Sequence, residues 1–171
     1  MGNNNNNEQT LPQDVDGFEY VTNALMATVN QFPGLEEGET FSFSMIPTEE
    51  GLSIIASSGS FIYQEQESII GHVWQTCLYP FTVVYRASGL NQTRKIAAKE
   101  WLDNLGRWLV RQPITINGTN YVLSEWPKLT GDREIRNIIR QTPAFLGNIN
   151  EDKSENWVMD MQIQYRNEFD R

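Results

Sequence analysis

The chain contains one histidine, His72, and one cysteine, Cys77, and these are the first candidates for nucleophilic or metal chemistry. Their positions differ by five, so on one extended strand their side chains would point to opposite faces of a sheet. A zinc site needs several spaced His and Cys ligands, which this sequence does not offer. Because Cys77 lies in an apolar run, it is expected to be a buried structural thiol. The sequence therefore predicts a protein that is not an enzyme, with no catalytic residue, no metal and no cofactor.

Carboxylate pairs are the next candidates for chemistry. Glu49 and Glu50 stand beside a predicted turn, and Glu65 and Glu67 share one face of a predicted strand. Two carboxylates can act as general acid and general base only where a pocket separates their pKa values. Acids at turns and sheet edges are normally solvated, so these pairs predict a charged surface and not a catalytic site.

The candidates for binding are three arginines, Arg133, Arg136 and Arg140, and one tryptophan. The arginines could grip phosphate or pair with acids of a neighbouring subunit, and an acidic chain favours the second interpretation. Trp126 lies in a polar, irregular stretch, where an exposed indole would suit an interface anchor. In the predicted subunit interface the arginines face Glu49 and Glu50 across the seam. Its residues are Glu49, Glu50, Trp126, Arg133, Arg136 and Arg140.

The composition limits the kind of protein that can position these side chains. With 171 residues, 39% of them hydrophobic, the chain can bury a real core, so we expect a single domain over residues 14–171 after a flexible Asn-rich tail at 1–13. The 22 acidic and 13 basic residues give a net charge of −9, which argues against a tight grip on nucleic acid. No apolar run reaches the roughly 20 residues that span a bilayer, and no signal peptide is recognisable, so no membrane partner is expected.

Two amphipathic helices are predicted. The first covers 17–32, where Asp16 and Glu19 form a capping box. Its apolar stripe consists of Phe18, Val21, Leu25, Val29 and Phe32. The second covers 91–111, begins at the cap Asn91 and ends before Pro113. The residues expected on its buried face are Ala97, Trp101, Leu105, Trp108 and Leu109.

Alternating apolar residues predict the strands. Residues 40–57 are expected to form a hairpin, a further strand begins at Phe61, and a long strand covers 72–86. Pro80 interrupts this long strand and implies an edge position or a bulge. Asn117-Gly118 predicts a turn between two short strands, with a loop longer than two residues.

The C-terminal third is predicted to be mostly β-structure. Residues 131–141 fit both a helix and a two-sided strand, and the strand is favoured. Residues 144–156 are expected to be a polar loop, and 157–166 alternate clearly as a strand. The predicted fold class is α+β, a mostly antiparallel β-sheet packed by two long α-helices.

The order of these elements resembles the tail terminator and head–tail joining proteins of tailed bacteriophages, small proteins also described as minor capsid proteins. The resemblance rests on the C-terminal run from Trp157 to Phe169, on the helix from Arg94 to Arg111 that follows Val83-Val84-Tyr85-Arg86, and on the helix 17–32. It covers most of the chain from about residue 16 onwards. The Asn-rich start and the polar residues 148–156 lie outside it.

The resemblance implies a tail-terminator-like fold and a structural role in the neck or tail of a virion, assembled in the cytoplasm of the host bacterium. Such proteins form a hexameric ring that caps the tail tube, ends tube polymerisation and joins the tail to the head. The implied partners are further copies of the chain, the tail tube protein and the head connector or stopper, while DNA passes through the lumen without specific binding. Two alternatives stay open: another neck or tail component, such as a stopper or tube subunit, and an enzyme or ligand-binding domain with an unfamiliar site.

Overall fold

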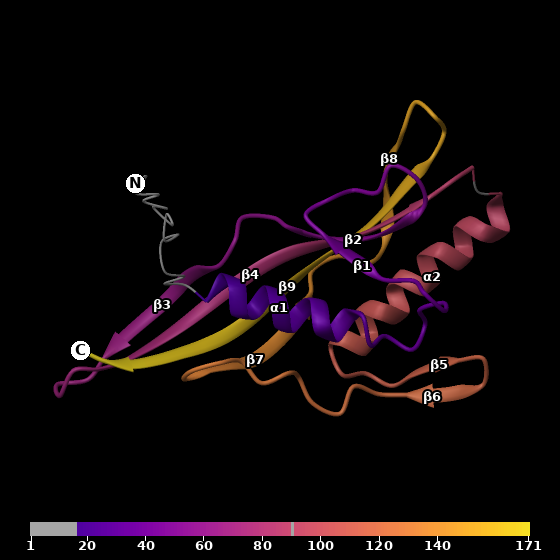
Figure 1. Cartoon of the computed structure of the whole chain (residues 1–171). Coiled ribbons are helices and arrows are strands. Elements are labelled where there is room, and N and C mark those ends of the chain that lie inside the picture. The colour runs from indigo at the N-terminus through magenta and orange to yellow at the C-terminus, as the bar shows by residue number, and fades with distance from the viewer. Residues whose placement is uncertain (1–16, 90) are drawn as a thin grey trace, which may run out of the picture.

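Two long antiparallel strands run through the structure, a computed structural model that describes residues 17–89 and 91–171 (Figure 1). They are β4 (His72–Ala87) and β9 (Glu155–Asp170), each 16 residues long. Every residue of one strand lies opposite a residue of the other, from His72 and Asp170 at one end to Ala87 and Glu155 at the other. We call this pair the ribbon, and it confirms the strands predicted at 72–86 and 157–166.

Five further strands flank the ribbon and complete a mixed, mostly antiparallel seven-stranded sheet. On the β4 side lie β1 (Phe41–Phe43), β2 (Gly51–Ala56) and β3 (Phe61–Glu67). On the β9 side lie β7 (Arg133–Arg140) and β8 (Phe145–Ile149). One end of the sheet therefore has the order β1-β2-β4-β9-β8, and the other end has the order β3-β4-β9-β7.

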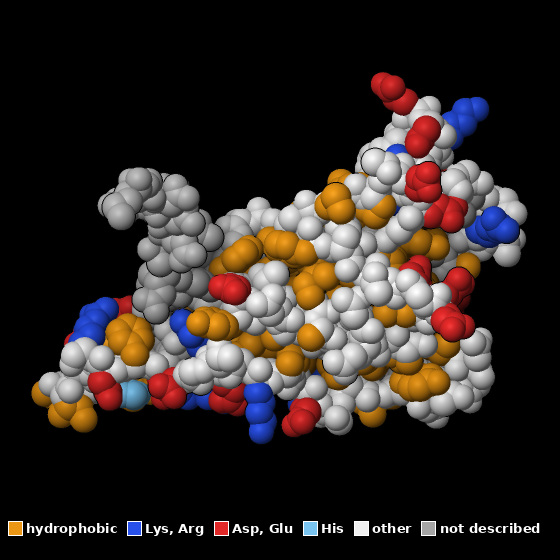
Figure 2. Space-filling view, in the orientation of Figure 1, with side chains coloured by type: hydrophobic (Ala, Val, Ile, Leu, Met, Phe, Trp, Pro, Cys, Tyr) orange, Lys and Arg blue, Asp and Glu red, His pale blue; other side chains and the backbone are white. Residues whose placement is uncertain are grey.

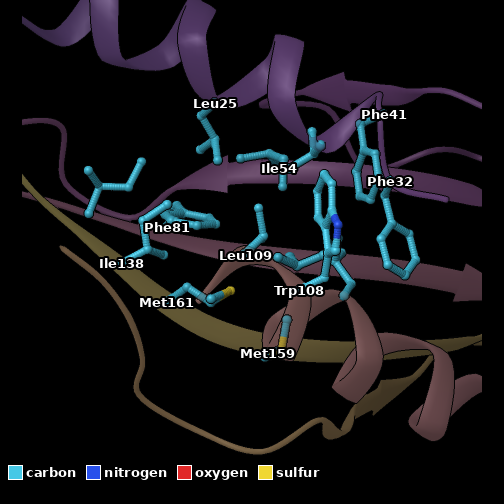
Figure 3. Close-up of a cluster of buried hydrophobic side chains, with 14 of the residues drawn as sticks. Leu25, Phe32, Phe41, Ile54, Phe81, Trp108, Leu109, Ile138, Met159 and Met161 are labelled. Atoms are coloured by element: carbon cyan, nitrogen blue, oxygen red, sulfur yellow. The ribbon is translucent and has the colours of Figure 1, made fainter. Parts of the chain in front are cut away.

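Two helices, α1 (Phe18–Val29) and α2 (Gln92–Leu109), pack on one face of this sheet, which confirms the α+β class. A separate hairpin of β5 (Ile114–Ile116) and β6 (Thr119–Tyr121) follows α2 (Figure 1). The ribbon contributes inward-facing pairs such as Phe81 opposite Met161 and Val83 opposite Met159. Figure 3 shows Leu25 of α1 and Leu109 of α2 pointing into this same cluster.

Helix α1 matches its predicted apolar stripe. Val21, Leu25 and Val29 are buried, and Phe32 continues the stripe beyond the end of the helix. The N-cap position is taken by Gly17, whose φ of 76° suits glycine. The predicted cap Asp16 and the predicted tail at 1–13 lie outside the described residues.

Helix α2 begins as predicted, since the side chain of Asn91 accepts a hydrogen bond of 3.0 Å from the N–H of Arg94. Its buried face differs from the prediction in the first turns, where Ala97 is exposed and Ala98 and Leu102 are buried. Steps of four residues advance about 40° beyond a full turn, so the predicted line through Ala97, Trp101 and Leu105 drifts around the helix. The observed buried residues, such as Ala98, Leu102, Leu105 and Leu109, are spaced by alternating steps of four and three residues, so their side chains keep facing the sheet.

Residues 40–57 do not form the predicted hairpin. Strands β1 and β2 pair in parallel, with Phe41 opposite Leu52 and Phe43 opposite Ile54. Ser44 turns the chain with a φ of 51° and donates its N–H to the carbonyl of Ile54 at 2.8 Å. Period-two alternation buries the same apolar residues in either strand direction, so it does not reveal whether a pair is parallel or antiparallel.

Pro80 lies inside the central strand β4 without interrupting it, so the predicted edge position or bulge is wrong. It sits opposite Gln162 in regular register. On the other side, β2 ends at Ala56 and β3 begins at Phe61, and the N–H of Ser57 donates to the carbonyl of Pro80 at 3.1 Å. The side of Pro80 that lacks an N–H therefore faces the gap between β2 and β3, where no ladder hydrogen bond is required.

The segment 131–141, which fits both a helix and a strand by its sequence, contains the strand β7.

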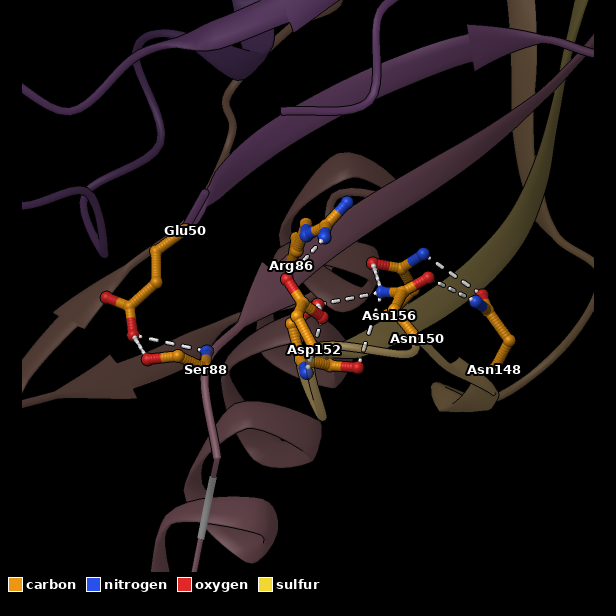
Figure 4. Close-up of polar contacts among 8 residues, drawn as sticks. Glu50, Arg86, Ser88, Asn148, Asn150, Asp152 and Asn156 are labelled. Atoms are coloured by element: carbon orange, nitrogen blue, oxygen red, sulfur yellow. Dashed lines mark hydrogen bonds and ion pairs between the residues drawn. The ribbon is translucent and has the colours of Figure 1, made fainter. Parts of the chain in front are cut away.

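Two connections are shorter than predicted. Asn117 and Gly118, with φ values of 49° and 79°, make a two-residue turn of the hairpin type between Ile116 and Thr119. The predicted loop 144–156 is largely strand β8 and the start of β9. A hydrogen bond of 3.0 Å from Asn156 to Asn148 ties these strands together (Figure 4). Apolar and polar residues do not alternate along this stretch, so it lacks the pattern that reveals a half-buried strand.

Replacing Phe81 by alanine tests whether the ribbon and the helices share one core. Phe81 is fully buried opposite Met161, so Phe81→Ala should lower the free energy of unfolding by about 3–5 kcal/mol in urea denaturation. The matched control is Ile96→Ala on α2, where the side chain is 61% exposed and the change should stay within about 0.5 kcal/mol. A loss below about 1 kcal/mol for Phe81→Ala would contradict this packing.

Candidate subunit interface

The six residues predicted to form an interface lie in different places, and several are occupied by contacts within the chain. The carboxylate of Glu50 accepts hydrogen bonds from the hydroxyl of Ser88 and, at 3.2 Å, from its N–H (Figure 4). The bond from the Ser88 hydroxyl is the main reason why the pKa of Glu50 is lowered. Glu50 therefore fastens the β1–β2 connection to the segment that follows β4, and Glu49 beside it is exposed.

The three arginines do not form one cluster. Arg140 lies 3.3 Å from the carboxylate of Asp103 on α2, and Arg136 lies 3.2 Å from its neighbour on β7, Glu134. The guanidinium of Arg133 stacks over the ring of Tyr20 at 5.1 Å. Each arginine thus has a contact inside its own chain, and Arg140 serves to hold α2 against the sheet.

Asp103 is the acceptor that organises this contact. Its carboxylate also accepts the N–H of Ala144 at 3.0 Å and the ammonium of Lys99 at 2.7 Å. Burial by itself would raise the pKa of Asp103, but these hydrogen bonds outweigh burial and lower it. Asp103 therefore joins α2 to the segment between β7 and β8 as a charged group.

Trp126 is half-buried and not fully exposed, and its place in an interface stays a prediction. Its Nε1 donates to the carbonyl of Leu109 at 2.9 Å, and the guanidinium of Arg111 lies 5.2 Å from the centre of its ring. The indole packs the segment before β7 against the end of α2, which a polar local sequence does not reveal. One side of Trp126 remains open and lines a pocket of about 520 Å³ beside β7, which we call the β7 pocket.

The β7 pocket brings together three of the six predicted interface residues: Trp126, Arg133 and Arg136. Leu129 and the buried Ile135 add to its apolar wall, while four basic and two acidic residues line it in all. We call the four basic residues of this lining the basic rim. A pocket lined by apolar and mostly basic residues can receive an apolar group that carries negative charge around it. Glu49, Glu50 and Arg140 lie outside this pocket.

Two edge strands, β3 and β8, expose apolar side chains. All seven residues of β3 and all five residues of β8 are exposed. The large hydrophobic side chains among them are Phe61, Ile62, Tyr63, Phe145, Leu146 and Ile149. Their free backbone groups can pair with a strand from another chain. The sequence signal for such a strand is a run of consecutive apolar residues, as at 61–63. A strand with one face in solvent needs apolar residues at every second position only.

Ion pairs stiffen the end of the ribbon next to β3. The Nδ1 of His72 lies 2.6 Å from Asp170 and its Nε2 lies 3.5 Å from Glu168. Arg171 contacts Glu65 and Glu67, each at 2.9 Å. These contacts link β3, β4 and β9 across the sheet. His72 therefore lies among carboxylates on the face opposite Cys77, which is 1% exposed in the core.

The other chemical possibilities find little support in the part of the chain that the structure describes. Within residues 17–89 and 91–171, no group of three or more His, Cys, Asp and Glu side chains is arranged to hold a metal ion. Neither described helix has the length and apolar character needed to cross a membrane. No protein-family model matches the chain, and a comparison with curated proteins found no relative. We therefore infer its function from its exposed surfaces and the order of its elements.

The histidine offers a direct test of the ribbon end. The hydrogen bond to Asp170, assisted by Glu168, raises the pKa of His72 above its ordinary value of about 6.5. The stabilisation by the charged ring is therefore fully present below the ordinary pKa and is lost as pH rises through the raised value. An NMR titration of this single histidine should show the raised pKa, and Asp170→Asn should lower it. Asp152→Asn, at the far end of the ribbon, is the control and should change nothing; an unshifted His72 in the unaltered protein would contradict the contact.

Proposed function

We propose that this chain is a structural protein of a tailed-bacteriophage virion, a tail terminator. In this role, copies of the chain form a ring, expected to be a hexamer, on the end of the tail tube. The ring ends tube polymerisation and joins the tail to the head connector or stopper. It acts in the neck of the virion after assembly in the cytoplasm of the host bacterium.

The observation that carries the proposal is the pair of edge strands β3 and β8, each of which pairs with one strand only among residues 17–89 and 91–171. They flank opposite sides of the ribbon at opposite ends, since β3 pairs with β4 near His72 and β8 pairs with β9 near Glu155. A ring needs two different surfaces on each subunit, so that one surface meets the other on the next copy and the rotation closes. Pairing of these two edges would extend the sheet from subunit to subunit and cover their apolar side chains.

Charge and element order agree with the same role. The net charge of −9 suits a ring whose lumen lets DNA pass without holding it, because a tight grip on phosphate requires a basic surface. The succession of helix, strands, helix, hairpin and terminal long strand is the order that resembles tail terminators. The proposed role also needs no catalytic group, which fits a buried Cys77 and a His72 paired with carboxylates.

The decisive experiment removes the gene from the phage that encodes the chain. We expect tails of uncontrolled length that fail to join heads, visible by electron microscopy, because nothing stops the growth of the tube. Complete absence of tails would instead assign the chain to the tube itself. Normal infectious particles would end the proposal.

Complementation of this strain tests the role of the edge strand. Tyr63→Asp places a charge on β3, where the side chain is 69% exposed in a single chain, and should fail to restore infectivity. Ile96→Asp introduces the same charge at a comparably exposed site on α2, away from the sheet edges, and should restore it. Equal rescue by both variants would exclude β3 from the interface.

A further inference from the structure

The turn between β3 and β4 presents two apolar side chains at the extremity of the ribbon. Ile69 and Ile70 are 107% and 88% exposed, so they contact almost nothing within the chain. Gly71 closes the turn by donating its N–H to the carbonyl of Ser68 at 3.0 Å. Figure 2 shows hydrophobic side chains at this end of the molecule, beside the single histidine. Two neighbouring isoleucines held out in water indicate a contact surface.

Negative charge surrounds these isoleucines. We define the arm tip as residues 65–72 and 168–171, which include four acidic side chains and one arginine. Arg171, the arginine, contacts two of the acids, and its N–H donates to the carbonyl of Gly71 at 2.9 Å. The tip is therefore an apolar projection with acidic residues around it, which we call the acidic border, at the end of the β4–β9 ladder.

The β7 pocket has the complementary character. Its apolar wall includes Trp126, Leu129 and Ile135, and its four basic residues outnumber its two acidic ones. Its volume of about 520 Å³ has room for apolar side chains from outside. The pocket lies beside β7, which flanks β9 on the same side as β8. A neighbouring copy that brings its β3 edge to β8 would thus bring its arm tip to this same side of the sheet.

We propose that the arm tip of one copy docks into the β7 pocket of the next copy, with Ile69 and Ile70 against the apolar wall and the acidic border against the basic rim. This inference rests on the proposed ring function and names its interface. Ile69 and Ile70 are exposed within the single chain, so the contact joins two copies. It is head-to-tail, as a closed ring requires, and the opposite charges give it orientation.

Disulfide cross-linking between two full-length variants tests the contact. One chain carries Ile70→Cys and the other carries Leu129→Cys, and the mixture is oxidised. A linked pair should form only when both variants are present. Cys77 is buried, so the unaltered protein provides the background. The matched control replaces Ile70→Cys by Ile96→Cys, an exposed position on α2, and should give no pair with Leu129→Cys.

The charge complementarity has a separate readout. Adding Lys128→Glu and Arg136→Glu to the Leu129→Cys chain should slow the cross-link at least about tenfold at low salt, because acid would then face acid. The difference should shrink at high salt. A cross-linking rate that changes neither with the two glutamate substitutions nor with salt would overturn the assigned role of the basic rim.

The cross-link also separates this inference from the proposed function. If purified protein is monomeric, the same two variants are co-produced during phage growth and the assembled particles are oxidised. Absence of the Ile70–Leu129 link in oligomers and in particles overturns the docking, and so does a link from Ile70→Cys to a different protein. Uncontrolled tail length in the deletion strain would then still support the terminator role, whereas normal particles would reject that role independently of any link.

Discussion

The β4–β9 ladder is the part of the structure on which the flanking strands and both helices assemble. It joins 16 residue pairs in one unbroken antiparallel register, so both strands present their apolar side chains to the same face. That face receives α1 and α2, while the opposite face carries polar contacts such as the 2.7 Å hydrogen bond from Thr82 to Asp160. The flanking strands attach to this ribbon in two halves, and the gap between β2 and β3 lets a proline sit within the central strand.

The length of the ribbon bears on the assembly that we propose. Figure 1 shows that the end carrying β3 extends beyond the two helices, so their apolar faces do not cover it. Exposing Ile69 and Ile70 to water is unfavourable and contributes nothing to the fold of a single chain. The same end of the ribbon carries paired charges that keep its shape. Under the docking that we propose, the partner is a second copy of this chain, which carries the β7 pocket with its excess of basic residues.

Intramolecular contacts account for several of the charged residues that first suggested an interface. Glu50 is bound to Ser88, and Arg140 is bound to Asp103. Such contacts fasten loops and helices to the sheet. Trp126, Arg133 and Arg136 remain at the β7 pocket, although Trp126 reaches it as a half-buried residue and not as an exposed anchor.

The sequence by itself determined the elements whose apolar period is long and regular: α1, α2, β4 and β9, together with the α+β class and the turn at Asn117-Gly118. Such periods reflect which side of an element faces the core, a property that each segment carries alone. Only the tertiary structure decided that β1 pairs in parallel, that Pro80 faces a gap, and that residues 145–149 form a strand. It also decided which charges are paired, because Arg140 and Asp103 are 37 residues apart and only packing brings them together. Strand direction and long-range contact are properties of two segments at once, and no local pattern records them.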